Sequence, residues 1–299
     1  MTRWVSLSET VEQLRRVAGG APVPPACELR QAAGLLATVT HGPEMVFGMP
    51  AIVNCAALAL SMPRLVVHRL SAGATRVVAE TDLHSLPGEP PHLLRGPWLL
   101  EARRPEEPLF GQTASLGGYE LDGVIYLVGL DHPDGVYVAR WVPHWREEDL
   151  EAGIQRDDSP LIADVDAHHA WARDAARFAV VLGLLLVAEG SPLLADEEQL
   201  APRRRGARAP RQPAGDSAEG WLVRRIHLGR ITPSRQRAGE EAGAAADLSG
   251  RLPQTVPVRG HVKRQRYGPA RAEVKWIYVD GYEARRWVAP RPLRIDVSG

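Results

Sequence analysis

The chain has 299 residues, 44% of them hydrophobic and 24% charged, with 36 Lys and Arg against 36 Asp and Glu. This apolar content, the lack of a three-residue glycine period and the presence of only two cysteines, Cys27 and Cys55, exclude collagen-like, mainly disordered and disulfide-stapled proteins. At about 100 to 200 residues per domain, the length allows one large domain or two smaller ones.

The zero net charge conceals a strong asymmetry along the chain. Residues 1–200 carry 15 basic and 27 acidic residues, whereas residues 201–299 carry 21 and 9, so the two parts have net charges of −12 and +12. A basic part of this kind either binds a polyanion or pairs with the acidic part of its own chain. We expect an acidic core domain over 1–200, an Arg- and Pro-rich linker over 201–220 and a basic, β-rich segment over 221–299.

Neither an export signal nor a membrane span is expected. Residues 1–20 are polar and amphipathic and lack the basic start and apolar centre of a secretory signal. The longest apolar run, Phe178–Ala188, has 11 residues, against the roughly 20 needed to cross a bilayer. The sequence therefore predicts a cytoplasmic protein with no membrane partner, whose two thiols are reduced and buried.

The first elements of the chain are expected to mix helix and strand. Apolar residues at three-residue steps predict a short helix over Thr10–Val17. The next stretch, Leu29–Thr40, fits either a helix or a strand. Leu65–Leu70 and Thr75–Ala79 are expected to be strands of a hairpin that turns through Ser71–Gly73.

The middle of the chain predicts a sheet. Strands are expected over Trp98–Ala102, Gly123–Leu130 and Gly135–Val142, the last two rich in β-branched and aromatic residues. These strands would share one antiparallel sheet. Gly117 and Gly118 read as isolated turn glycines.

A long helix is predicted over Ala167–Glu189, because it ends at Gly190 with Pro192 behind it. Its second half is apolar on every side, which is typical of a helix buried in a domain. We therefore expect an α+β fold in which an antiparallel sheet packs on this long central helix. The basic C-terminal strands either extend that sheet or form a small β-hairpin lobe.

The C-terminal third begins with a segment that cannot build a core. Pro202–Pro213 combines arginines and prolines without a large apolar residue, so we expect a loop or a disordered arm. A strand follows over Trp221–Leu228. Farther on, two antiparallel strands over 258–267 and 274–279 are expected to join through Gly268 and Pro269.

Basic and aromatic side chains concentrate in this last hairpin. The basic residues are Arg259, Lys263, Arg264, Arg266 and Lys275, and the aromatic residues are Tyr267, Trp276 and Tyr278. Guanidinium groups bind phosphates through paired hydrogen bonds, and aromatic faces accept unstacked bases, so the pattern favours RNA or single-stranded DNA as the partner. The alternative is that the strand supplies salt bridges to the acidic part of the chain, with Trp276 and Tyr278 as core residues.

The same segment resembles an uncharacterised group of proteins from phages, plasmids and other bacterial mobile elements. The likeness rests on the order of a long apolar helix, an Arg- and Pro-rich connection, a short strand and then a short motif. The motif residues are Arg259, Gly260, His261, Lys263, Arg264 and Gln265, followed by Trp276 and Ile277. The resemblance implies a setting in mobile elements or phage defence and assigns no activity.

A ribonuclease toxin is a second hypothesis. Metal-independent ribonucleases need only proton transfer and charge stabilisation, because the 2′-hydroxyl of the RNA attacks the phosphate. His261 would act as the base, Arg259 or Arg264 would bind the phosphate and Tyr267 would donate the proton. Whether the protein is an enzyme at all is left open.

A third hypothesis is a protein-interaction or assembly component. In that case the oppositely charged parts would dock on each other or on neighbouring copies of the chain. The hairpin arginines would then lie against Glu147, Glu148 or Asp149 rather than face solvent.

No metal or cofactor site is expected. His168 and His169 lie near Asp164 and Asp166, but neighbouring helical positions point about 100° apart and cannot readily chelate one ion. A helix-end role suits them better. The chain also lacks the glycine-rich phosphate loop, the dinucleotide fingerprint and the nucleophile elbow.

Overall fold

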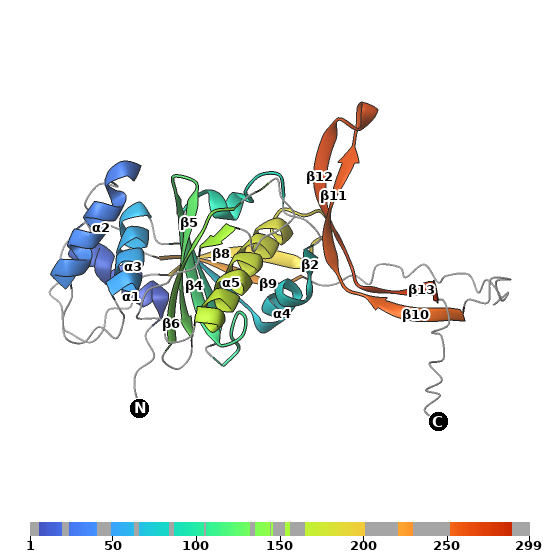
Figure 1. The fold of residues 1–299 in the computed structure, drawn as a ribbon, viewed down its shortest axis with the longest axis horizontal. Helices are drawn as coiled ribbons and strands as arrows, with labels where there is room; N and C mark the ends of the chain where they lie inside the picture. The colour runs from blue at the N-terminus through green and yellow to red at the C-terminus, as the bar shows by residue number, and fades with distance from the viewer. Residues whose placement is uncertain are drawn as a thin grey trace, which may run out of the picture.

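The structure is a computed structural model and describes residues 6–19, 24–40, 49–62, 66–83, 87–104, 106–131, 135–143, 145, 153–155, 165–200, 221–229 and 252–288. A large, mostly antiparallel sheet lies between two layers of helices, and a two-stranded ribbon of β-strands projects beyond one of these layers (Figure 1). The predicted α+β class is confirmed.

The main sheet has eight strands in the order β7-β6-β5-β4-β3-β1-β9-β8. β1 runs parallel to both of its neighbours, β3 and β9, and the other neighbouring pairs are antiparallel. The strands are β1 (Val66–Leu70), β3 (Trp98–Ala102), β4 (Thr113–Leu121), β5 (Val124–Asp131), β6 (Gly135–Trp141), β7 (Ile154–Gln155), β8 (Leu193–Leu200) and β9 (Trp221–Leu228). Strand β9 therefore extends the main sheet, which is one of the two placements that the sequence leaves open.

Helices cover both faces of this sheet. One layer consists of α1 (Leu7–Val17), α2 (Ala26–Thr40) and α3 (Met49–Ser61), and the other of α4 (Ala72–Glu80), the 3-10 turn η1 (His92–Arg95) and α5 (Val165–Leu185) (Figure 1). Within the described ranges, no helix is both long enough and apolar enough to cross a membrane.

The inner strands of the main sheet contribute side chains to two hydrophobic cores, one on each face of the sheet. Leu99 and Val128 pack with the α1–α3 layer, whereas their chain neighbours Leu100 and Leu127 pack with α5. This alternation follows from the two-residue period of a strand. Because both faces of the sheet are covered, these strands contain near-continuous apolar runs instead of an apolar–polar alternation.

The ribbon is built from the C-terminal strands. Its strands are β10 (Leu252–Val258), β11 (His261–Tyr267), β12 (Glu273–Val279) and β13 (Tyr282–Val288), and the short strand β2 (Asp82–Leu83) lies parallel to β11. β10 pairs with β13 and β11 with β12, both antiparallel. Two residues on each strand, 259–260 and 280–281, separate the two pairs, so they are two arms of one ribbon in one register.

The hairpin predicted over residues 65–79 is wrong. Its second half is helix α4, which begins after Ser71, whose hydroxyl accepts a hydrogen bond from the Ala74 backbone N–H at 3.3 Å. The buried residues of α4 include Ala74 and Val78, which are four positions apart and share one helix face. The segment is helical because Ser71 caps its first turn, although its β-branched residues are typical of a strand.

Gly117 and Gly118 are not turn glycines. They lie in the middle of β4, where a Cβ on Gly118 would come within 2.4 Å of the Trp98 ring. Strand β4 thus has glycines because large side chains cross its surface. The thiols also differ from expectation, since Cys55 is buried but Cys27 is exposed.

Part of the charge asymmetry cancels where the acidic part of the chain meets the basic part. On β9, Arg224 Nε donates to Glu197 Oε1 on β8 at 3.1 Å, and His227 Nε2 lies 3.7 Å from Asp196 Oδ2. Asp196 is also directly opposite Arg225 in the strand register. Pairing between the two parts of the chain therefore takes place inside the main sheet, at its β8 edge.

The packing of α5 on β5 can be tested with two glycines. A Cβ on Gly129 would lie 2.3 Å from the Trp171 ring, whose indole N–H is held by Thr113 Oγ1 at 3.0 Å, whereas a Cβ on Gly34 in α2 would meet nothing within 4 Å. We expect Gly129→Ala to lower the free energy of unfolding by about 1–3 kcal/mol. Gly34→Ala should raise it by about 0.5–1 kcal/mol. Urea denaturation midpoints measure both, and a fully stable Gly129→Ala variant would contradict this packing.

The buried imidazole of His68 on β1 predicts a pH dependence of stability. Burial, followed by the charge of Arg224, lowers the pKa of His68 to about 4, and Nδ1 has no hydrogen-bond partner among the described residues. The unfolded chain takes up a proton near pH 6.5 and the folded chain does not, so this contribution to stability is lost as pH falls from about 6.5 to 4.

The expected loss is on the order of 2–3 kcal/mol at pH 4. In His68→Leu, which removes the titrating group, the difference in unfolding free energy between pH 7 and pH 4 should be smaller by that amount. Parallel pH profiles for the two proteins, measured by urea denaturation, would rule out His68 as the source.

Candidate nucleic-acid interface

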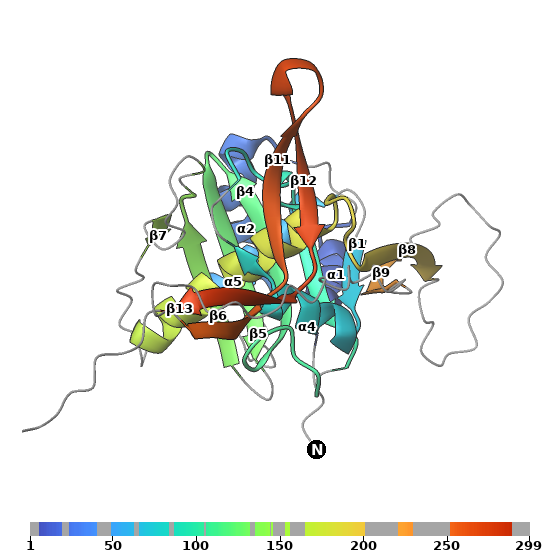
Figure 2. The ribbon, with the colours of Figure 1, turned by 90° about the vertical axis from the view of Figure 1, so that its right-hand side faces the viewer.

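The basic C-terminal segment forms the hairpin that the sequence predicts. β11 and β12 pair antiparallel from His261 opposite Val279 to Tyr267 opposite Glu273. Gly268, at φ 77°, and the 3-10 turn η3 (Pro269–Arg271) join them. The hairpin extends past the helices of the body (Figures 1 and 2).

Main-chain hydrogen bonds fix the base of this hairpin to the body. The Asp82 N–H in β2 donates to the carbonyl oxygen of Gly260 at 2.9 Å. The Glu189 N–H, just beyond α5, donates to the carbonyl oxygen of Trp276 at 2.9 Å, and the Tyr278 N–H donates to that of Glu189 at 3.0 Å. Val262 is buried in the α5 core between these attachments. The base of the hairpin is therefore an integral part of the fold.

Two of the three predicted stacking rings belong to this base. Trp276 and Tyr278 are partly buried and pack against the α5 core. The hydroxyl of Tyr278 is hydrogen-bonded to Thr81 and lies over Gly260, where a Cβ would come within 2.4 Å of it. Burial raises the pKa of Tyr278, and the charge of Asp280 acts in the same direction. Trp276 and Tyr278 therefore act as packing residues, which is the alternative to base stacking that the sequence leaves open.

The third ring, Tyr267, is at the far end of β11 and is 41% exposed. Its hydroxyl is hydrogen-bonded to Glu273, and the Lys275 Nζ lies 5.2 Å from its ring centroid. Lys275 in turn donates to Glu189 Oε2 at 2.5 Å. The hydrogen bond to Glu273 raises the pKa of Tyr267, which makes it a weaker proton donor than an unperturbed tyrosine.

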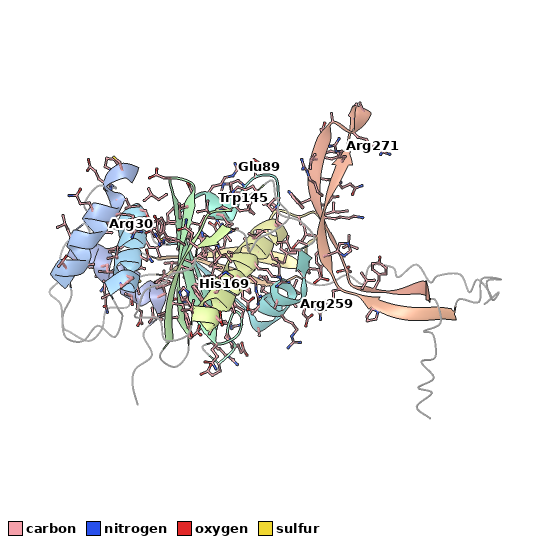
Figure 3. The ribbon with its side chains drawn as sticks, viewed as in Figure 1. Arg30, Glu89, Trp145, His169, Arg259 and Arg271 are labelled. Atoms are coloured by element: carbon pink, nitrogen blue, oxygen red, sulfur yellow. The ribbon has the colours of Figure 1, made fainter. Side chains whose placement is uncertain are left out.

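The remaining basic residues are exposed. Between Arg259 and Tyr282 the chain has six basic residues and two acidic ones. Lys275 is paired with Glu189, but within the described part of the chain no carboxylate forms an ion pair with the others. We call four of these the hairpin cations: Lys263, Arg264, Arg266 and Arg271. Figure 3 shows Arg271 at the tip and Arg259 at the bend of the ribbon.

The residues proposed for catalysis are not brought together. His261 and Tyr267 are at opposite ends of β11, six positions apart, which is about 20 Å along an extended strand. A base and an acid that serve one phosphate must both be within hydrogen-bond reach of it. His261 instead has its Nδ1 3.2 Å from the carbonyl oxygen of Arg259. This geometry gives no support to the ribonuclease hypothesis.

The acidic residues expected opposite the arginines, Glu147, Glu148 and Asp149, lie outside the described residues, as does Pro202–Pro213. His168, by contrast, is described and is buried, with Nε2 2.5 Å from the carbonyl oxygen of Val138. In the described ranges, no three His, Cys, Asp or Glu side chains gather closely enough to hold a metal ion.

Sequence reasoning missed three residues of the hairpin. Arg271 is in the turn, at φ 55°, and could have been found as one more basic residue between the strands. Glu273 follows directly and pairs with Tyr267 across the hairpin. Glu189 has no signal in the sequence, because it is 86 positions from the lysine that it binds.

Comparison with known proteins adds no further assignment. No family model matches the sequence, and no curated protein matches it either. Functional inference therefore rests on the chemistry of the hairpin.

Proposed function

We propose that this protein binds nucleic acid through the hairpin cations. The observation that carries the proposal is that these side chains are exposed on a projecting hairpin and form no ion pair with the described carboxylates. Guanidinium and ammonium groups in such a position are suited to phosphate oxygens. The resemblance of the Arg259–Gln265 motif to mobile-element proteins adds a setting in phage or plasmid biology to the proposal.

In this proposal the binding free energy comes mainly from contacts with phosphates and less from base stacking. Arg264 and Arg266 are two positions apart on one strand face, about 7 Å from each other. Their repulsion in water is about 0.6 kcal/mol, which an exposed hairpin tolerates. A phosphate between them replaces the repulsion with two charge-assisted hydrogen bonds, each worth about 1.5–3 kcal/mol. Binding of an anionic polymer is thus favourable without any enclosed pocket.

The proposal is tested with the triple variant K263A/R264A/R266A, called the hairpin triple variant. Its affinity for a labelled, mixed-sequence oligonucleotide, measured by fluorescence anisotropy, should fall by about tenfold or more at low salt. The magnitude of the slope of log K against log salt concentration should decrease by about two to three. The variant contacts fewer phosphates, so its binding releases fewer counterions.

A matched control removes three exposed arginines elsewhere, in R16A/R104A/R140A, and so changes the net charge equally. Arg16 and Arg104 form exposed ion pairs with Glu12 and Glu107, so their loss should cost little stability. Equal affinity losses in the two triple variants, or wild-type binding that does not respond to salt, would refute the hairpin as the interface.

A further inference from the structure

The cations of the hairpin are distributed over both faces of a thin ribbon. Residues directly opposite each other in an antiparallel pair share a face, and successive residues alternate. The register puts Lys263 opposite Ile277 and Gln265 opposite Lys275 on one face. Arg264 and Arg266, opposite Trp276 and Val274, are on the other face. A partner that touches only the face of Arg264 and Arg266 would therefore leave Lys263 without a contact.

The shape of the hairpin narrows the partner further. Its two strands are about 4.8 Å apart, and Lys263 and Tyr267, four positions apart on β11, are about 14 Å from each other along the strand. The major groove of B-form DNA is about 12 Å wide and 8.5 Å deep and admits a two-stranded β-ribbon. Phosphates line both walls of that groove, so a ribbon that enters tip first presents a charged face to each wall.

We propose that the β11–β12 hairpin enters the major groove of B-form DNA, with Arg271 leading at the tip. This inference rests on the proposed function and specifies its partner. Arg266, near the tip, faces one phosphate wall inside the groove, whereas Arg264 and Lys263 are nearer the base on opposite faces, toward the groove rim, where the phosphates lie. Arg271 and the turn around it are the parts of the hairpin that reach base edges, where an arginine can pair with guanine.

Single-stranded nucleic acid fits this hairpin less well. Single strands are held by aromatic faces on which successive bases stack. Trp276 and Tyr278 pack against the α5 core, and the ring of Tyr267 is engaged by Lys275 and Glu273. No run of free rings is left along the described hairpin. Duplex RNA is disfavoured because the A-form major groove is deep and too narrow for side chains to read.

The experiment compares four labelled probes of one mixed sequence by fluorescence anisotropy with the full chain: a DNA duplex of about 20 base pairs, or two helical turns, each of its strands, and the RNA duplex. At equal salt, the DNA duplex should bind about tenfold or more tightly than the other three. Methylation of guanine N7, which lies in the major groove, should weaken binding to the DNA duplex. The hairpin triple variant should lose the preference for DNA duplex, and R16A/R104A/R140A should keep it.

The outcomes separate the two proposals. Equal or tighter binding of a single strand or of the RNA duplex would overturn groove insertion and leave nucleic-acid binding in place, as would indifference to N7 methylation. Failure to bind any of the four probes would remove both proposals. Circular dichroism of each variant establishes that the fold is retained, since all three substituted hairpin residues are exposed.

Discussion

The attachment of the hairpin base to the body is the constraint on which the arrangement of the hairpin side chains depends. Three main-chain hydrogen bonds connect residues 260, 276 and 278 with β2 and with the end of α5. They place Val262 in the core, and strand alternation then determines which of the following side chains share its face. The same attachment uses Trp276 and Tyr278 as packing residues. One set of contacts thus both fixes the direction in which the hairpin projects and uses two aromatic rings for packing at its base.

The two parts of the chain pair with each other between β8 and β9 of the main sheet, and at the base of the hairpin through Lys275 and Glu189. Arg224 and His227 of β9 meet Glu197 and Asp196 of β8 inside the main sheet. These pairs are exposed, and such pairs contribute at most about 1 kcal/mol each. They also place acidic side chains on a strand at the edge of the sheet, which discourages pairing with another chain. The net charge of zero is therefore no sign that the hairpin is neutralised by the described part of the molecule.

Local chemistry made part of this structure predictable. The long helix before Gly190, the strands around Val124–Asp131 and the turn at Gly268 all follow from residue types and spacing, although α5 ends at Leu185, four residues before its predicted end at Glu189. The N-terminal helical layer and strand β4 were harder to predict, because a sheet buried on both faces and helices packed on it have similarly apolar sequences. The site residues were readable as a set of charges. The sequence could not show which aromatic rings would be exposed, because that depends on contacts between distant residues, such as Glu189 and Trp276, which are 87 positions apart.

An exposed β-ribbon needs protection from pairing with other chains, and charged residues on its edges supply it. Beyond the attachments of β11 to β2 and of β12 to Glu189, the described structure has no further strand beside the hairpin. Charged side chains on the edge, lysine above all, are the usual form of this protection. Four hairpin cations form no ion pair with the described carboxylates, two of them arginines two positions apart on one face, and the single glutamate of β12 is hydrogen-bonded to Tyr267. Protection alone leaves this excess of positive charge unexplained, whereas the proposed partner, with phosphates on both sides of the ribbon, would account for it.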